Sequence, residues 1–179
     1  MSVCCETTAA YLPSSTICNS HNLNDKWVLY NHLPSVKDWT IEGYNILMKD
    51  IDTVEKVVTL NRHLPDNMIK YSMLFYMRNG ITPLWEDKNN KSGGCFSYKV
   101  LNKNVVQVWK NMMYLISGES LSEDESYMNA INGITISPKK NFCIIKVWIK
   151  DTKHQDTQMI TNIEQLTKHG SMFKLHNDN

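Results

Sequence analysis

The sequence predicts an α+β fold, in which one curved antiparallel sheet of about seven or eight strands carries three or four helices on its convex face. Short segments rich in β-branched and aromatic residues alternate between apolar and polar positions, as half-covered strands do. In three or four places the apolar spacing changes to that of a helix. The strands follow one another through turn-like connections, which favours antiparallel pairing with all helices on one side.

Length and composition predict one domain. The chain has 179 residues, and we expect a flexible tail over 1–20 followed by a single domain over 21–179. The formal net charge of +1 does not favour long DNA or an anionic membrane as partner. No signal peptide is apparent, and no apolar stretch approaches the roughly 20 residues that cross a bilayer. We therefore expect a cytoplasmic protein that does not enter a membrane.

The cysteines predict neither a disulfide framework nor a metal site. They form no CxxC pair, and their spacing relative to histidine resembles no zinc site. Their odd number and scattered positions suit reduced thiols. The five positions are Cys4, Cys5, Cys18, Cys95 and Cys143. We expect no metal ion and no cofactor.

In the first 101 residues the strand signals come from large apolar and aromatic side chains. Four segments have this composition: 26–32, 45–48, 73–78 and 96–101. A helix is predicted over 52–65, because the segment starts with Asp-Thr and stops at a proline. Within 96–101, Phe96, Tyr98 and Val100 share one face. A polar loop, PLWEDKNNKSGG over 83–94, separates the last two strands.

The rest of the chain mixes helical and strand-like segments. Apolar spacing predicts helices over 104–116, 122–128 and 156–169, and strands over 131–137, 141–150 and 172–177. In the last helix Met159, Ile163 and Leu166 would form the apolar stripe, with Gly170 just beyond the C-terminus. In the strand around 142–149, one face is wholly apolar, whereas the other carries Lys146 and Trp148.

The tryptophans separate into core and loop positions. Trp109 lies on a helical apolar stripe and Trp27 at the start of a strand, so we expect both in the core. Trp39, in KDWTIEG, and Trp85, in PLWED, have polar, loop-like surroundings. A single loop tryptophan is more often a packing residue than a ligand platform. Two of them beside carboxylates and lysines favour a site for a flat, polar ligand.

Several collinear motifs carry a resemblance to a known family. The segments are ITPLWEDKNNKSGG, DKW at 25–27, DTVE at 52–55, VWKNMMYLISGES at 108–120 and KVWIKD at 146–151. From about residue 21 to the C-terminus, the sequence resembles the eukaryotic translation initiation factor 4E family. The resemblance implies a cupped sheet whose concave side binds the 7-methylguanosine cap of mRNA in translation initiation. It implies two binding partners: capped mRNA, and a scaffold protein of the initiation factor 4G type or a divergent cognate partner. Outside the complex with these partners, we expect the chain to be a monomer.

The implied site suits the chemistry of the cap. Methylation at N7 gives the purine a positive charge, which two parallel indoles, those of Trp39 and Trp85, would hold between their π faces. The carboxylate of Glu86 would accept two hydrogen bonds from guanine N1–H and its 2-amino group, which adenine does not offer. Trp148 matches the family's tryptophan near the N7 methyl group; a plain packing role for it is nearly as well supported.

The phosphate chain requires cations, and here the sequence departs from the family. The family has an arginine after the Gly-Gly pair, where this chain has Cys95. The candidates are, first, the lysines of the turn after residue 137, then a lysine sharing a strand face with Trp148, and last a lysine of the polar loop. These are Lys139, Lys140, Lys146 and Lys91.

The convex back departs as well. In the family, a tryptophan of the first helix docks the helical YxxxxLΦ motif of scaffolds and repressors; Val58 occupies that position here. His21 is followed by asparagine rather than by the family's proline, and Lys110 and Asn111 replace a Leu-Glu pair. We expect weak binding of the ordinary scaffold, or a partner specific to this protein.

Two alternatives stay open. A repressor-type homologue would occupy caps without recruiting ribosomes. A nucleotide-processing enzyme would hold the purine between the same indoles, but it needs a metal or a base at the phosphates, and no nucleophile–base pair stands out. We therefore expect a binding protein rather than an enzyme. The bias towards Asn, Ile and Lys suggests a source with an AT-rich genome, such as a protist or a large DNA virus.

Overall fold

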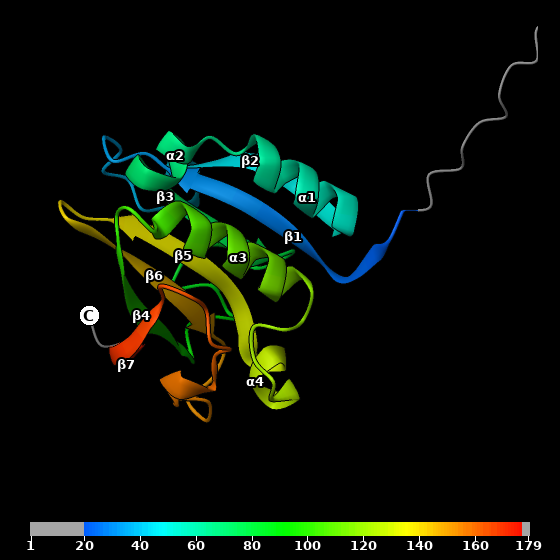
Figure 1. Ribbon diagram of the computed structural model, residues 1–179, viewed down its shortest axis with the longest axis vertical. Coiled ribbons are helices and arrows are strands. Elements are labelled where there is room, and N and C mark those ends of the chain that lie inside the picture. Colours follow the sequence, from blue (N-terminus) through cyan, green and yellow to red (C-terminus); the bar gives the residue numbers. More distant parts are fainter. Residues whose placement is uncertain (1–19, 177–179) are drawn as a thin grey trace, which may run out of the picture.

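The computed structural model describes residues 20–176, and seven strands of this region form one antiparallel sheet (Figure 1). Their order across the sheet is β2-β1-β3-β5-β6-β4-β7. The strands are β1 (Asn22–His32), β2 (Tyr44–Thr53), β3 (Met73–Arg78), β4 (Gly94–Leu101), β5 (Ile131–Pro138), β6 (Phe142–Ile149) and β7 (Thr167–Leu175). The predicted fold class is confirmed. The predicted tail lies almost wholly outside the described residues.

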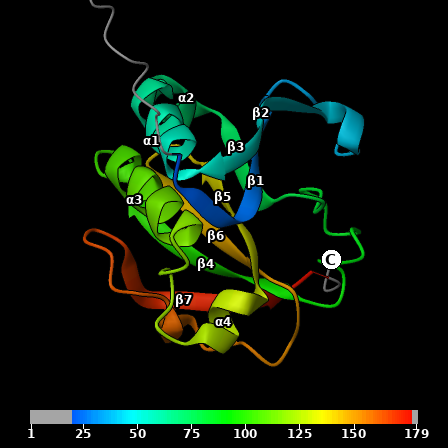
Figure 2. The same cartoon turned by 90° about the vertical axis from the view of Figure 1, so that its right-hand side faces the viewer.

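Three helices cover one face of the sheet. These three are α1 (Val54–His63), α2 (Asp66–Tyr71) and α3 (Val105–Ser117), and a fourth helix, α4 (Glu125–Ala130), follows α3. Figure 2 shows α1, α2 and α3 together on one side, with α4 below them. The Thr53 side chain caps α1 by accepting a hydrogen bond from the Lys56 N–H, and Asp124 caps α4. The helices predicted over 52–65 and 104–116 are thus confirmed, and the one predicted over 122–128 is shifted to 125–130.

The core lies between the sheet and these helices. On β6 the side chains of Cys143, Ile145 and Val147 are buried against the helical layer, as the alternation predicts. Trp109 of α3 and Trp27 of β1 are fully buried in the same cluster. The side chains at the alternate positions of each strand therefore lie on the opposite, concave face. On β6 these include Lys146 and Trp148.

The helix predicted over 156–169 is wrong. The segment contains only the short 3-10 turn η2 (Thr157–Met159), and strand β7 already begins at Thr167. Ile160, Ile163 and Leu166 are buried individually against the core, without an intervening helix. Gly170, with a φ of +74°, lies inside β7 rather than at a helix end. The final strand is therefore longer than the predicted 172–177.

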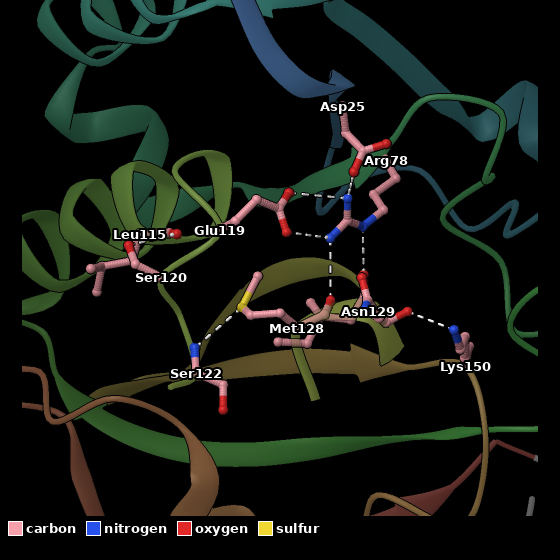
Figure 3. Close-up of polar contacts among 10 residues, drawn as sticks. Asp25, Arg78, Leu115, Glu119, Ser120, Ser122, Met128, Asn129 and Lys150 are labelled. Atoms are coloured by element: carbon pink, nitrogen blue, oxygen red, sulfur yellow. Dashed lines mark hydrogen bonds and ion pairs between the residues drawn. The ribbon is translucent and has the colours of Figure 1, made fainter. Parts of the chain in front are cut away.

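A partly buried guanidinium joins four parts of the fold at one end of the sheet (Figure 3). Arg78 of β3 pairs with Asp25 of β1 and with Glu119, which follows α3. It also donates hydrogen bonds to the carbonyls of Met128 and Ile131, at the junction of α4 and β5. Arginine suits this position because its planar fork satisfies several acceptors at once.

Two further sequence predictions concern thiols and membranes. Cys95 and Cys143 are buried free thiols, whereas Cys4, Cys5 and Cys18 lie outside the described residues. Among the helices of residues 20–176, none has the length and apolar character needed to span a membrane.

Candidate ligand pocket on the concave face

A pocket of about 360 Å³ opens on the concave face of the sheet. Figure 2 shows the β1–β2 and β3–β4 connections projecting on the side opposite α1–α3. These connections carry Trp39, Trp85 and Glu86, which line the pocket. The strands β2, β3, β5 and β6 supply its floor. The lining residues are Trp39, Tyr44, Met73, Phe75, Pro83, Leu84, Trp85, Glu86, Thr135, Ser137, Lys146 and Trp148.

The first wall is Trp39, in the loop between β1 and β2. Its indole is 54% exposed, and it stacks on the imidazole of His32, with ring centroids 4.1 Å apart and planes 4° apart. Nε2 of His32 donates a hydrogen bond of 2.7 Å to the Asp38 carbonyl, since a carbonyl only accepts. The Asp38 carboxylate accepts from the backbone and hydroxyl of Thr40. The loop around Trp39 is therefore held on both sides of the indole.

A glycine permits this loop to close. A Cβ at Gly43 would lie 2.1 Å from the Asp38 carbonyl oxygen, a distance that no side chain tolerates. Gly43 ends the short 3-10 turn η1 (Ile41–Gly43), which directly precedes β2. The glycine at the end of the KDWTIEG segment is therefore required for the close approach of Gly43 to the Asp38 carbonyl.

The second wall is Trp85, in the polar loop between β3 and β4, with its side chain 37% exposed. Asn90 holds this loop from inside. Its fully buried side chain donates hydrogen bonds of 3.0 and 2.8 Å to the carbonyls of Thr82 and Leu84. It also accepts a bond of 2.9 Å from Asn132 of β5. The loop is anchored next to Trp85, so the indole is positioned before any ligand arrives.

A histidine from the end of the chain lies behind this second indole. The rings of His176 and Trp85 are 6.3 Å apart and within 5° of parallel. Nδ1 of His176 donates a 2.8 Å hydrogen bond to the Asn90 carbonyl. Burial lowers the pKa of His176, and the positive charge of Lys146 lowers it further, against the opposing effect of that hydrogen bond. The imidazole is therefore kept in its neutral form at neutral pH.

The floor is aromatic and closely packed. Trp148 is buried, and its indole N–H donates a 2.6 Å hydrogen bond to the Thr135 hydroxyl. Phe75 lies edge-on to both Trp148 and Tyr44. Burial, together with the negative charge of Glu86, raises the pKa of Tyr44 to about 12. Trp148 thus packs in the floor and also lines the pocket, and its contact with an N7 methyl group stays a prediction.

The two neighbouring acids of the polar loop have separate environments. Asp87 accepts hydrogen bonds from the backbone and side chain of Thr82 and of Asn89. Burial acts to raise the pKa of Asp87, but these bonds together outweigh it and lower the pKa. Asp87 is therefore part of the loop's internal structure. Glu86, by contrast, is one of the residues that line the pocket.

The predicted phosphate-binding lysines do not all gather at the pocket. Lys146 lines it, with Nζ 5.5 Å from the centre of the Trp85 ring. Lys139 and Lys140 are exposed in the β5–β6 turn and Lys91 is exposed in the polar loop, and none of the three is among the lining residues. The geometry therefore favours Lys146 among the four candidates.

The predicted partner-binding residues lie on the convex back. His21 forms a 2.6 Å contact with Glu55 at the start of α1, and this contact lowers the pKa of Glu55 to about 2. Lys110 of α3 pairs with Asp66 of α2 at 3.3 Å. The remaining two, Asn111 and Val58, are partly exposed on α3 and α1. Asn111 accepts a 2.8 Å hydrogen bond from Gln107 on the same helix.

Several residues that support the pocket were missed from the sequence. These residues orient the walls or the floor through contacts that a local sequence pattern does not predict. They are His32, Tyr44, Asn90, Asn132 and His176. Only His32 had a visible signal: in the predicted strand over 26–32 it shares a face with Tyr30 and Val28, on the side away from Trp27.

Fold and site together define a class of protein: a cupped antiparallel sheet with two tryptophans and a glutamate lining one pocket on its concave face. The family model for eukaryotic initiation factor 4E matches residues 22–179. Eukaryotic translation initiation factor 4E of Eremothecium gossypii is 31% identical over 161 residues, covering 86% of this chain and 70% of that protein. The chain belongs to the eukaryotic initiation factor 4E family.

Solved structures agree with this assignment. Ascaris suum eIF4E-3 in complex with an m2,2,7G cap superposes with a TM-score of 0.63 at 25% identity, covering 75% of this chain and 76% of that one. Schistosome eIF4E in complex with m7GpppG and 4E-BP gives a TM-score of 0.67 at 24% identity, covering 76% and 75%. At 24% identity, the similarity to the schistosome protein shows a shared fold.

Proposed function

We propose that this protein binds the 7-methylguanosine cap of mRNA and acts in translation initiation. The observation that carries the proposal is that Trp39, Trp85 and Glu86, from two separate loops, line one pocket. The cationic, methylated purine lies between the two indoles, each of which presents an electron-rich face. Stacking contributes about 1–3 kcal/mol per base, and the cation–π attraction adds to it.

Glu86 selects guanine. An ionised carboxylate accepts the N1–H and the 2-amino group of guanine in a pair of charge-assisted hydrogen bonds. Adenine lacks both donors at these positions and would leave the carboxylate unpaired, which costs affinity. Trp148 of the floor is the candidate for contact with the N7 methyl group. Its fixed hydrogen bond to Thr135 supports this role, because the ring keeps one orientation.

Lys146 receives the phosphate chain. It is the candidate lysine that lines the pocket, beside the hydroxyl-bearing Thr135 and Ser137. A lysine ammonium is a compact, mobile point charge that suits a flexible chain of phosphates. Lys139, Lys140 and Lys91 stay weaker candidates for the more distant phosphates.

A scaffold on the convex back is the second partner. The schistosome relative was solved with 4E-BP, and the C. elegans eIF4E-3 with the 4E-binding protein Mextli. The candidate contacts of this chain are His21, Val58, Lys110 and Asn111. A repressor-type homologue is the second candidate function, because Lys110 is already paired with Asp66 and Val58 offers no indole.

We place this protein in the cytoplasm, as a binding factor rather than an enzyme, with 21–179 as its single domain. Asp87 supports the non-enzymatic role, since its hydrogen bonds within the loop leave Glu86 as the one acid of that pair facing the ligand. Incubating a cap analogue with the protein and Mg²⁺ tests this point, and turnover of the analogue would contradict it.

Retention on immobilised 7-methylguanosine triphosphate tests the function itself. We expect the protein to be retained, to be eluted by free cap analogue, and to resist elution by unmethylated GTP. Elution by both nucleotides at the same concentration would contradict the proposal, because the cationic base would then not be recognised.

A further inference from the structure

The free protein already holds a cation over one of the two indoles of the pocket. Nζ of Lys146 lies 5.5 Å from the centre of the Trp85 ring, within the distance at which an aromatic face attracts an ammonium group. Both residues line the pocket. The ammonium group therefore lies on the side of Trp85 where the methylated purine, itself a cation, is proposed to stack.

Lys146 reaches the indole from the floor of the pocket. It alternates with Trp148 along β6, so both side chains rise from the concave face. The residues opposite Lys146 on the neighbouring strands are Ser97 of β4 and Thr135 of β5, and neither carries a charge. The flexible four-carbon stem of a lysine can therefore aim its charge at the wall or into the pocket.

The ammonium group has no carboxylate partner in the described part of the chain. Glu86 lines the same pocket, but within residues 20–176 Lys146 forms no ion pair. Burial lowers the pKa of His176 and raises that of the Cys95 thiol, and the charge of Lys146 adds to the first effect and opposes the second. Lys146 is therefore able to exchange the indole for a stronger acceptor.

This exchange couples two parts of a ligand. The purine takes the face of Trp85 only when the ammonium group leaves it, and losing that cation–π contact lowers affinity about two- to fivefold. Phosphate oxygens offer the ammonium group charge-assisted hydrogen bonds, which are among the strong ones. A ligand with phosphates therefore gives the displaced ammonium group a new partner, whereas a nucleoside leaves it with water alone.

We propose that Lys146 is a resident cation on Trp85, which the base displaces onto the phosphates, and that this exchange makes the site discriminate against the bare nucleoside. The proposal rests on the proposed cap-binding function. It gives Lys146 a role in the free protein in addition to its contact with phosphate. Full affinity then requires the base and the phosphates together.

Two ligands that differ only in their phosphates test the proposal: 7-methylguanosine and its triphosphate. Their affinities for the wild type, Lys146→Ala and Lys146→Gln are measured by calorimetric titration, which does not depend on tryptophan fluorescence. We expect both variants to bind the nucleoside about two- to fivefold more tightly than the wild type, because no cation has to leave Trp85. Both should bind the triphosphate about tenfold more weakly, since the bonds from the ammonium group to phosphate are lost.

Two further variants separate charge from other effects. Lys146→Arg keeps a cation at the indole, so we expect it to bind the nucleoside no more tightly than the wild type. Lys103→Ala removes an exposed lysine between β4 and α3 and leaves both affinities as they are.

Three results overturn the proposal. The first is nucleoside binding by Lys146→Ala and Lys146→Gln that is equal to or weaker than that of the wild type, since the ammonium group would then not occupy the face of the base. The second is a gain for Lys146→Arg as large as that of the neutral variants. The third is an unchanged affinity of the neutral variants for the triphosphate. Failure of the triphosphate to bind the wild type refutes the proposed function instead.

Discussion

The imidazole of His32 lies parallel to the indole of Trp39, with ring centroids 4.1 Å apart and planes 4° apart. One face of Trp39 is thereby covered by the protein, and the other is left for a ligand. The ring of His176 is also nearly parallel to that of Trp85, within 5°, although their centroids are further apart, at 6.3 Å. Each proposed wall of the site is thus a tryptophan supported from behind by a histidine, and both histidines are fixed by a hydrogen bond to a loop carbonyl.

Removing the support behind Trp39 lowers cap affinity. His32→Ala leaves the indole free to turn, and an aromatic pair of this kind contributes about 0.5–1.5 kcal/mol beyond its buried area. We expect affinity for the cap analogue to fall about three- to tenfold, measured by fluorescence titration. His32→Phe retains the stack and restores most of the affinity, whereas the exposed His63→Ala leaves it unchanged. A phenylalanine variant as weak as the alanine variant would show that the hydrogen bond to Asp38, rather than the stack, is what matters.

The buried imidazole of His176 makes stability depend on pH. Because its pKa is lowered in the folded protein, the unfolded chain takes up the proton first as the pH falls below about 6.5. The unfolded state then binds more protons, so stability is complete above that pH and is lost below it, by at most about 1.4 kcal/mol per pH unit. Thermal unfolding between pH 7.5 and 5.5 measures this effect.

His176→Phe provides the comparison, since it keeps an aromatic ring behind Trp85 and removes the titrating group. We expect the variant to lose less stability than the wild type on acidification. Parallel pH profiles of the two proteins would exclude His176 as the source.

Asn90 is expected to stabilise the loop of Trp85. Asn90→Ala removes three hydrogen bonds from a fully buried position and leaves the carbonyls of Thr82 and Leu84 without that donor. Buried unsatisfied groups of this kind cost about 1–3 kcal/mol each, and we expect about 2–4 kcal/mol in all. Urea denaturation measures the loss. Lys88→Ala, two residues earlier and exposed, is the control and should lie within about 0.5 kcal/mol of the wild type.

The convex back is expected to bind an ordinary scaffold weakly. A helical peptide with the YxxxxLΦ motif would contact Val58, which has no indole N–H to donate a hydrogen bond. It would also contact Lys110, which is already paired with Asp66. Calorimetric titration should give an affinity weaker than micromolar for the wild type. Val58→Trp restores an indole and should strengthen binding by about tenfold, the effect of 1.4 kcal/mol. Submicromolar binding by the wild type would end this idea.

Much of the fold followed from short-range patterns. The alternation along β6 correctly assigned Cys143, Ile145 and Val147 to the core and Lys146 and Trp148 to the other face. The helical spacing around Trp109 correctly predicted α3, because one continuous apolar stripe packs on the sheet. These predictions succeed where a single element buries one regular face.

The same spacing misled over 156–169. Of the predicted stripe, Ile163 and Leu166 are buried in the core, but they lie in an irregular segment. Met159 is only partly buried, and its neighbour Ile160 contacts the core instead. Periodicity cannot distinguish these cases, since it carries no information about tertiary contacts.

The walls of the site were predicted, but their supports were not. Trp39 and Trp85 stand out as large apolar residues in polar segments. His176 acts on a loop 86 residues away in sequence, so its partner is fixed only by the placement of β7 beside β4.

The central claim is that a cationic guanine is held between Trp39 and Trp85 and identified by Glu86. Titration with 7-methylguanosine triphosphate and with GTP, followed by quenching of tryptophan fluorescence, tests it most directly. The account predicts strong quenching and at least tenfold tighter binding of the methylated nucleotide. It also predicts loss of this preference in Trp85→Ala and of guanine selectivity over adenine in Glu86→Gln. Equal affinity for both nucleotides, or a Trp85→Ala variant that binds as tightly as the wild type, would contradict it.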